Sequence, residues 1–273
     1  MEGTGNDFVV VDATKHAFEL DATQIRRIAD RHTGVGFDQL LVIEPPRSAG
    51  TDFYYRIFNP DGHEVSQCGN GVRCFVRYVH EKGLSHKDII RVETLSGTVE
   101  PRLDADGNVT VDMGSPRFDP VDIPMSMPRR EHSYTIPVNG AEVEIGAVSL
   151  GNPHAVHLVT DVESAPVSTQ GPLIERHRIF PERVNAGYMQ IIDRHTIRLR
   201  VWERGAGETL ACGTGACAAV VIGIYWELLS SPVFVQTRGG QLRIAWQGEG
   251  TSVFMSGPAR TVFEGEIILQ GDK

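Results

Sequence analysis

The chain has 273 residues, enough for one large domain or two modest ones, and its 41% hydrophobic and 22% charged residues are those of an ordinary soluble globular protein. It has 26 Lys and Arg residues against 35 Asp and Glu residues, and this net charge of −9 argues against a nucleic-acid surface. No stretch approaches the roughly 18 consecutive apolar residues of a membrane helix, so no membrane partner is expected. The N-terminus lacks the pattern of a secretory signal, and four cysteines are too few for a disulfide scaffold, so we predict a cytoplasmic protein.

Taken in chain order, the patterns predict three helices among many short strands. Residues 21–31 begin with Asp-x-x-Gln, a capping-box pattern, and a second helix is expected to follow Gly71 and to end at Gly83. A third helix is expected over 215–229. The expected strands are 8–12, 39–43, 54–58, 90–94, 109–113, 155–159, 188–192, 196–202, 233–237 and 242–246, with hairpin turns at Asp106-Gly107 and Gly239-Gly240. Because strands outnumber helices, the predicted class is α+β.

The two halves of the chain resemble one another. Four short segments of the first half recur in the second half, in the same order and at nearly constant spacing, which predicts an internal duplication. The matched segments are Gly5-Asn6-Asp7-Phe8 with Gly151-Asn152-Pro153-His154, Gly36-Phe37-Asp38-Gln39 with Gly187-Tyr188-Met189-Gln190, Arg56-Ile57-Phe58-Asn59 with Arg200-Val201-Trp202-Glu203, and Cys68-Gly69-Asn70-Gly71 with Cys212-Gly213-Thr214-Gly215. A site between two related domains would receive one copy of each motif.

The two Cys-Gly-x-Gly motifs carry the strongest chemical signal. Each directly precedes an apolar helical run, so Cys68 and Cys212 are expected near the first N–H groups of a helix. That position favours anions and lowers the pKa of a thiol. Cys74 and Cys217 fall inside the helices and are interpreted as packing residues. The cysteine spacing is unlike that of a zinc site, and a structural disulfide between Cys68 and Cys212 is not expected in the cytoplasm, although oxidation could join them.

Long motifs around both cysteines resemble the two signature segments of the diaminopimelate epimerase family. These motifs are Asn59-Pro-Asp-Gly-His-Glu-Val-Ser-Gln-Cys68-Gly-Asn-Gly-Val-Arg-Cys-Phe and Glu203-Arg-Gly-Ala-Gly-Glu-Thr-Leu-Ala-Cys212-Gly-Thr-Gly-Ala-Cys. The segments 5–8, 34–39, 151–154 and 181–185 also resemble motifs of that family. The resemblance covers essentially the whole chain.

The resemblance implies a fold and an activity. The fold would have two pseudo-symmetric lobes, each a curved, mostly antiparallel sheet or barrel around a central helix. The first lobe would span 1–113 and be completed by 259–273, the second would span 114–258, and the active site would lie in the cleft between them. The activity would be the interconversion of LL- and meso-diaminopimelate, on the route to lysine and peptidoglycan, in a protein that is usually a homodimer. Phe263 stands where some relatives have a dimer-contact tyrosine.

The resemblance also implies residue roles. Cys68 and Cys212 would be the catalytic acid and base, and His154 and Glu203 would tune their ionisation. The residues that would contact the amino-acid substrate are Asn6, Gln39, Asn59, Gly69, Asn70, Asn152, Asn185, Glu203, Arg204, Gly213 and Thr214. Relatives usually have a short strand before the first glycine-asparagine motif, and this chain begins at Met1 just before it. Either its start lies upstream or the first lobe lacks an edge strand.

Elementary chemistry agrees with those roles. Inversion of a stereocentre removes a proton from one face and returns one to the other, which two groups in opposite protonation states can do. Arg204 is suited to a substrate carboxylate, and helix N-termini are suited to the charge that develops on one. No lysine context suggests pyridoxal phosphate and no motif suggests a metal, so no cofactor is expected. Asn6 and Asn152 could instead cap turns, and His154 could be a structural histidine.

Two rival functions stay open. The first is another cofactor-independent racemase or isomerase of the same fold, such as a proline racemase, which the many asparagines and Arg204 disfavour. The second is a non-catalytic module that binds an amino acid or a metal.

Overall fold

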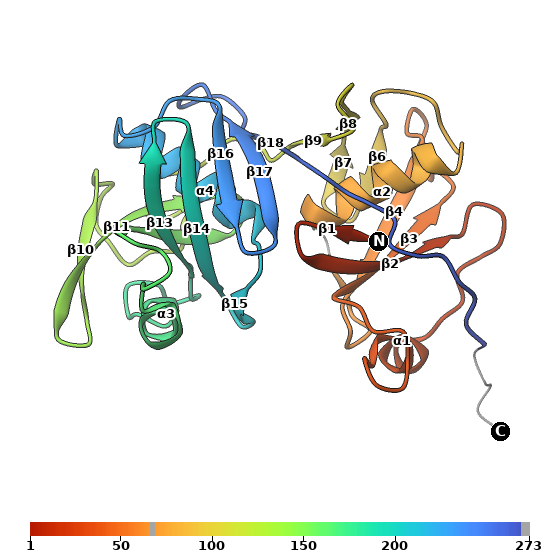
Figure 1. The fold of residues 1–273 in the computed structure, drawn as a ribbon, viewed down its shortest axis with the longest axis horizontal. Coiled ribbons are helices and arrows are strands. Elements are labelled where there is room, and N and C mark those ends of the chain that lie inside the picture. The colour runs from red at the N-terminus through yellow and green to blue at the C-terminus, as the bar shows by residue number, and fades with distance from the viewer. Residues whose placement is uncertain (66–68, 269–273) are drawn as a thin grey trace. The chain divides into compact units, whose positions relative to one another are not determined.

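The chain folds into two compact units in the computed structural model, which describes residues 1–65 and 69–268. Unit 1 comprises Met1–Val111 and the C-terminal segment from Gly257, and unit 2 comprises Asp112–Ser256. The chain therefore passes between the units twice. Figure 1 labels most of the elements of both units.

Unit 1 contains a short-stranded sheet and two helices. The sheet has the order β1-β2-β3-β4-β6-β7, with β5 paired on β4, and β8 and β9 form an antiparallel hairpin. The elements in chain order are β1 (Glu2–Gly3), β2 (Asn6–Asp12), α1 (Ala22–Ala29), β3 (Gln39–Glu44), β4 (Phe53–Phe58), β5 (Glu64–Val65), α2 (Gly69–Glu81), β6 (Val92–Thr94), β7 (Gly97–Val99), β8 (Arg102–Leu103) and β9 (Val109–Asp112). The C-terminal segment pairs with β1 through reciprocal backbone hydrogen bonds between Arg260 and Glu2.

Unit 2 contains a larger sheet, with the order β10-β11-β12-β13-β14-β16-β17-β18 and β15 paired on β14. Its elements are β10 (Tyr134–Val138), β11 (Ala141–Ser149), β12 (Pro153–Leu158), α3 (Val167–Glu175), β13 (Asn185–Asp193), β14 (Thr196–Glu203), β15 (Gly207–Thr209), α4 (Gly213–Tyr225), β16 (Val233–Thr237), β17 (Gly240–Ala245) and β18 (Phe254–Gly257). The fold is therefore a mixed α+β fold with few helices, as predicted.

The two units repeat one topology. In unit 1, β2 and β3 are parallel, β3 and β4 are antiparallel, β5 folds back on β4, β4 and β6 are parallel, and β6 and β7 are antiparallel. In unit 2, the strands β12, β13, β14, β15, β16 and β17 make the same pairings in the same order. A helix follows each hairpin, α2 in unit 1 and α4 in unit 2. The internal duplication predicted from the motifs is confirmed at the level of topology.

The strand register corrects one of the four predicted matches. Phe8 pairs with Gln39 in unit 1, and His154 pairs with Asn185 in unit 2. Because His154 is the counterpart of Phe8, the counterpart of Gln39 is Asn185, and the match of 36–39 with 187–190 is wrong. The glycine–aromatic pair that suggested it precedes β3 in unit 1 but lies inside β13 in unit 2.

The central helix of unit 2 is buried on every side. All residues from Gly215 to Gly223 are buried, and α4 contacts β11, β12, β13, β14, β16 and β17. A helix that is apolar all round can be stable only inside such a core. Each fully buried side chain of the size of Val220 or Ile222 contributes about 1.5–3 kcal/mol relative to an exposed one. The core therefore fixes the direction of α4, and with it the position of the helix N-terminus.

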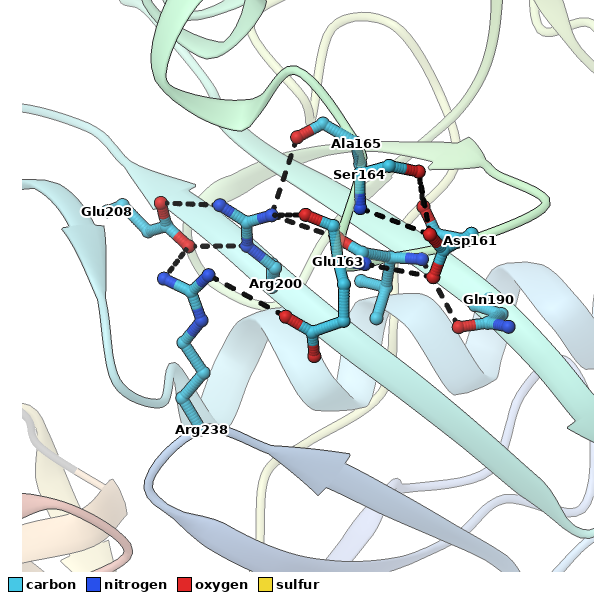
Figure 2. A network of polar contacts seen from close by, with 9 residues as sticks. Asp161, Glu163, Ser164, Ala165, Gln190, Arg200, Glu208 and Arg238 are labelled. Atoms are coloured by element: carbon cyan, nitrogen blue, oxygen red, sulfur yellow. Dashed lines mark hydrogen bonds and ion pairs between the residues drawn. The ribbon is translucent and has the colours of Figure 1, made fainter.

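In each unit an arginine–glutamate ion pair joins the two strands of the hairpin that precedes the helix. Arg56 on β4 contacts Glu64 on β5 through two bonds of 3.1 and 2.9 Å, and Arg200 on β14 contacts Glu208 on β15 through two bonds of 2.6 and 2.9 Å. Arg200 also donates to the carbonyl oxygens of Val162, Glu163 and Ala165, and Glu208 receives a second guanidinium from Arg238, as Figure 2 shows. Bidentate pairs of this kind fix geometry as well as adding energy.

The expected first helix is present, and its start is the one predicted. The Asp21 carboxylate accepts hydrogen bonds from the backbone N–H groups of Thr23 and Gln24, both at 2.8 Å, and the Gln24 side chain accepts from the backbone of Asp21 at 3.0 Å. This reciprocal arrangement is a complete capping box. None of the helices in the described residues is long and apolar enough to cross a membrane.

Candidate active site

In unit 2, one end of the sheet collects the predicted site residues. The strands β12 and β13 start at this end, and β14, which is antiparallel to β13, ends there. Asn152 and His154 therefore lie close to Asn185, and Glu203 and Arg204 come from the end of β14. The N-terminus of α4, with Cys212, Gly213 and Thr214, follows the β14–β15 hairpin.

Hydrogen bonds join the members of this cluster. Asn152 donates to the Thr214 hydroxyl at 3.3 Å, and its carbonyl oxygen lies 3.0 Å from Nε2 of His154. Thr214 lies 3.6 Å from the sulfur of Cys212. The side-chain oxygen of Asn185 accepts from the backbone N–H of Arg204 at 2.8 Å. The unit 2 residues predicted from the motifs are therefore brought together, and Cys212 joins them through its contact with Thr214.

The Cys212 thiol is buried and protonated at neutral pH. Only 6% of the residue is exposed, and this burial raises the pKa of the thiol well above its ordinary value, with the negative charge of Glu203 acting in the same direction. Hydrogen bonds from Thr214 and from the backbone of Gly215 lower the pKa but are smaller effects. The lowering of the pKa that was expected from the helix N-terminus is therefore outweighed at Cys212. Desolvation of a charged sulfur outweighs the helix terminus.

The Glu203 carboxylate is held by a residue that the sequence did not single out. The hydroxyl of Thr209, on β15, donates to Glu203 at 2.5 Å. Thr209 lies three residues before Cys212, inside the motif that carries the family resemblance. That position is the sequence feature by which Thr209 could be identified as a residue of the site. Arg204 is exposed and donates to the carbonyl oxygen of Glu182 at 3.0 Å.

His154 is a neutral imidazole. It is 1% exposed, and burial, assisted by the positive charge of Arg204, lowers its pKa from 6.5 to about 3. The ring therefore acts through a fixed hydrogen bond to Asn152, and the two roles foreseen for this histidine, tuning and structural support, are compatible with its position.

The buried histidine predicts a dependence of stability on pH. The unfolded chain protonates this side chain below about pH 6.5, whereas the folded chain resists protonation down to about pH 3. Between these values the free energy of unfolding falls by about 1.4 kcal/mol for each pH unit of acidification, which is about 2 kcal/mol by pH 5. The His154→Gln variant keeps a side-chain N–H that can donate to Asn152 but has no group that titrates in this range. Its free energy of unfolding should therefore lack this contribution to the fall between pH 7.5 and pH 5. Urea unfolding at pH 7.5 and pH 5 would measure it.

The matched control for that experiment is His157→Gln, which changes a partly exposed histidine on the same strand. This variant should keep the wild-type difference between the two pH values. Parallel profiles for wild type and His154→Gln would contradict the burial argument.

Unit 1 presents a second cluster at the equivalent end of its own sheet. Asn6 and Gln39 lie at the starts of the parallel strands β2 and β3, and Asn59 follows the end of the antiparallel β4. Gln39 donates to the carbonyl oxygen of Asn59 at 3.1 Å, and Asn70, in the first turn of α2, donates to Asn6. The five unit 1 residues predicted from the motifs, Asn6, Gln39, Asn59, Gly69 and Asn70, therefore occupy the places that Asn152, Asn185, Glu203, Gly213 and Thr214 occupy in unit 2.

Cys68, the other predicted catalytic cysteine, lies outside the described residues. It directly precedes Gly69, the first residue of α2, as Cys212 precedes Gly213, the first residue of α4. Cys74 and Cys217 are fully buried inside these two helices, in accordance with a packing role. Among the described residues, no group of three or more His, Cys, Asp or Glu side chains is arranged to hold a metal ion.

The duplicated fold defines a structural class. It matches the crystal structure of a PhzF-family phenazine biosynthesis protein from Bacillus anthracis with a TM-score of 0.69 at 18% identity, over 98% of this chain and 95% of that one. It also matches a probable proline racemase from Agrobacterium radiobacter with a TM-score of 0.65 at 16% identity, over 90% of this chain and 81% of that one. The protein therefore has the two-unit α+β fold of these structures.

Sequence comparison narrows the class to one family. The profile of the diaminopimelate epimerase family matches residues 1–118 and 146–262. A diaminopimelate epimerase from Nitrosospira multiformis is 59% identical over 99% of this chain and 97% of the relative, and one from Nitrosomonas europaea is 60% identical over 98% of each. The chain belongs to the diaminopimelate epimerase family, and it is an isomerase.

Proposed function

We propose that this protein epimerises LL-2,6-diaminopimelate to meso-diaminopimelate with Cys68 and Cys212 as its two acid–base groups and without a cofactor. The observation that carries the proposal is the duplicated site. In each unit a cysteine precedes the first residue of a helix, and amide or carboxylate side chains from the same strand ends gather at that helix. A reaction that works on two faces of one carbon requires two such groups.

In the proposed mechanism the substrate binds with its α-carbon between the two sulfurs. The cysteine present as thiolate removes the α-proton and becomes a thiol, and the thiol on the opposite face gives its proton to the carbanion and becomes a thiolate. Cys212 enters this exchange as the thiol, because burial and Glu203 raise its pKa. After one turnover the protonation states of the pair are exchanged. Before the next LL substrate binds, Cys68 loses its proton to solvent and Cys212 gains one from solvent, which restores the starting state.

The charge that develops on the α-carboxylate is stabilised by the helix N-termini. The first N–H groups of a helix have no partner within the helix and carry a partial positive charge. Gly69 and Asn70 begin α2, and Gly213 and Thr214 begin α4. Fixed donors of this kind act on the transition state at no cost of reorganisation.

The rest of the site supports a substrate with two amino-acid ends. The proposed substrate contacts supply many more amide and charged groups than a single amino acid can satisfy. Arg204 is exposed, so its guanidinium can exchange its hydrogen bond to the Glu182 carbonyl oxygen for one to a distal carboxylate. The proposed contacts are Asn6, Gln39, Asn59, Gly69, Asn70, Asn152, Asn185, Glu203, Arg204, Gly213 and Thr214. These groups disfavour proline, which has one polar end.

A substrate panel tests this proposal. Purified enzyme under reducing conditions is incubated with LL-diaminopimelate, L-proline, trans-4-hydroxy-L-proline and L-lysine, and the isomers are resolved by chiral chromatography. We expect kcat/KM for LL-diaminopimelate to exceed that for each of the others at least about 10³-fold, because buried polar groups left unpaired by the wrong substrate are costly. Turnover of proline at a comparable rate would favour the racemase alternative. No turnover at all, with stoichiometric zinc bound, would favour a metal-binding module.

The same proposal includes a cytoplasmic homodimer that serves the synthesis of lysine and of peptidoglycan precursors. Unit 1 exposes several large apolar side chains on and near its C-terminal segment, including Val35, Val262, Phe263 and Ile267. Exposed apolar groups gathered on one unit are typical of an interaction surface. Analytical ultracentrifugation would support the dimer by a mass of twice 30.0 kDa, and a monomer at micromolar concentration would contradict it.

A further inference from the structure

A directed chain of hydrogen bonds runs through unit 1 from Arg73 to Asp38. Nη1 of Arg73 donates to the side-chain oxygen of Asn70 at 2.9 Å, and the Asn70 amide donates to the side-chain oxygen of Asn6 at 2.5 Å. The Asn6 amide in turn donates to the carboxylate of Asp38 at 3.0 Å. The other oxygen of that carboxylate accepts from Arg31 at 2.8 Å. Two proposed substrate contacts, Asn6 and Asn70, are thus the middle links of the chain.

Arg73, the first donor of this chain of hydrogen bonds, is buried inside the protein. Arg73 lies on α2 and is 0% exposed, an unusual environment for a side chain that keeps its charge. Its guanidinium also donates to the Thr4 hydroxyl at 2.5 Å and to the backbone oxygen of Pro258 at 3.3 Å. Thr4 and Asn70 are themselves buried, at 1% and 5% exposed. Arg73 is therefore fixed on several sides and presents Nη1 to Asn70 in one orientation.

The chemistry of its two ends gives the chain one direction. Guanidinium groups can only donate hydrogen bonds, and an ionised carboxylate can only accept them. With Arg73 at one end and Asp38 at the other, a flip of either amide would place donor against donor and acceptor against acceptor. Both amides therefore engage their oxygens within the chain and keep one N–H of each NH₂ group outside it.

We propose that Arg73 is a positioning residue, whose buried guanidinium sets the orientation of the Asn70 and Asn6 amides so that both offer N–H donors to an acceptor group of the substrate. The inference rests on the proposed function only for the identity of that acceptor, a substrate carboxylate. The orientation itself is a property of the free protein.

Unit 2 holds its equivalent asparagine by other means. The counterpart of Arg73 is Cys217, a small buried residue of α4. Asn152, the counterpart of Asn6, contacts the ring of His154 and donates to Thr214, so the bond between these two positions runs in the opposite direction from that in unit 1. The two halves of the site are therefore unlike in donor pattern, and Arg73 accounts for the pattern of unit 1.

The first test reads the amides directly and needs no activity. The NH₂ groups of Asn6 and Asn70 are assigned by ¹⁵N NMR in the wild type, in Arg73→Met and in Arg77→Met. Arg77 is the matched control, because it is on the same helix and pairs with Glu81 on the surface. We expect Arg73→Met to shift the resonances of both asparagines, and Arg77→Met to shift neither. An unchanged Asn6 resonance in Arg73→Met would overturn the proposal.

The second test measures coupling. Arg73→Met and Asp38→Ala break opposite ends of one chain, so each should lower kcat/KM about 10²-fold, the cost of a mispositioned contact, and the double variant should lose little more than either. A loss of kcat/KM in the double variant of about 10⁴-fold, the product of the two single losses, would show two independent roles and overturn the proposal. A kcat/KM within twofold of wild type in either single variant would also overturn it. If Arg73→Met does not fold, Asp38→Ala, at a side chain 40% exposed, must shift the Asn70 resonance instead. An inactive wild type would refute the proposed function, while the NMR result would still decide the role of Arg73.

Discussion

Replacement of Cys212 by serine is expected to lower kcat for the epimerisation of LL-diaminopimelate at least about 10³-fold. General acid–base groups contribute about 10²–10⁴-fold each, and a serine hydroxyl of similar size is far too weak an acid to replace the thiol in both of its roles. The backbone and the polar neighbours of residue 212 stay in place, so the free energy of unfolding should change by less than about 1 kcal/mol. Initial rates by chiral chromatography and urea unfolding would measure the two effects.

Cys217→Ser is the control for that experiment. The same change is made in the same helix, at a fully buried residue that has no proposed part in catalysis. This variant should lose stability and retain kcat within about threefold of wild type. Cys68→Ser should match Cys212→Ser in its loss of turnover, because both faces of the carbon are needed. Substantial kcat in either serine variant, above about a tenth of wild type, would be incompatible with a two-base mechanism.

Treatment with diamide is expected to abolish activity almost completely and reversibly. If the two sulfurs flank one carbon, they can approach one another when the site is empty. In that reaction the two thiols give two electrons and two protons to diamide and form a Cys68–Cys212 disulfide. Dithiothreitol should restore the activity, and LL-diaminopimelate present during oxidation should protect it. Peptide mapping by mass spectrometry would identify the crosslink.

The remaining cysteines provide the internal control for oxidation. Cys74 and Cys217 are both 0% exposed, so they should stay reduced under conditions that inactivate the enzyme. Cys212→Ser should form no intramolecular crosslink at all. Inactivated enzyme in which Cys68 and Cys212 remain unlinked would show that these two sulfurs do not meet.

Much of the fold could be predicted because the two duplicated units retain similar sequence motifs. The segments around Asn6, Asn152, Asn59 and Glu203 were matched correctly, and the strand register confirms that they fall at equivalent strand ends. Gln39 corresponds to Asn185 and not to Gln190, because the similar glycine–aromatic pairs at 36–37 and 187–188 stand at different places relative to their strands. Register is set by backbone pairing between strands, and a short motif does not report it.

Helix α3 and the β10–β11 hairpin of unit 2 are not among the elements predicted from the sequence. The helix α3 contains Gly171 and Pro172, which are poor helix formers, and it forms because tertiary packing overrides propensity. A side chain at residue 171 would lie only 2.7 Å from the ring of Trp202, so the glycine serves this close approach. The hairpin of β10 and β11 turns at Asn139-Gly140, where both residues have positive φ, and an Asn-Gly pair is itself a strong sequence signal for such a turn.

The ionisation of the site could not be predicted from position in the sequence. The position of a cysteine before a helix predicts a lowered thiol pKa, and α4 does begin directly after Cys212. The burial of Cys212 and the proximity of Glu203 are properties of the folded chain, and together they reverse the direction of the pKa shift. The hydrogen bonds of Thr209 and Arg73 are likewise visible only once the strands and helices are in place.

Isotope incorporation at initial rate distinguishes two acid–base groups on opposite faces of one carbon from a single group. LL-Diaminopimelate is incubated with the enzyme in deuterium oxide, and both the substrate and the meso product are recovered after a few per cent conversion. We expect one deuterium at the inverted carbon of the product and none in the recovered substrate, because the removed proton and the delivered deuteron belong to different thiols. Deuterium at equal levels in recovered substrate and product would show that a single group, exchanging with solvent, protonates both faces, and would contradict a two-base mechanism.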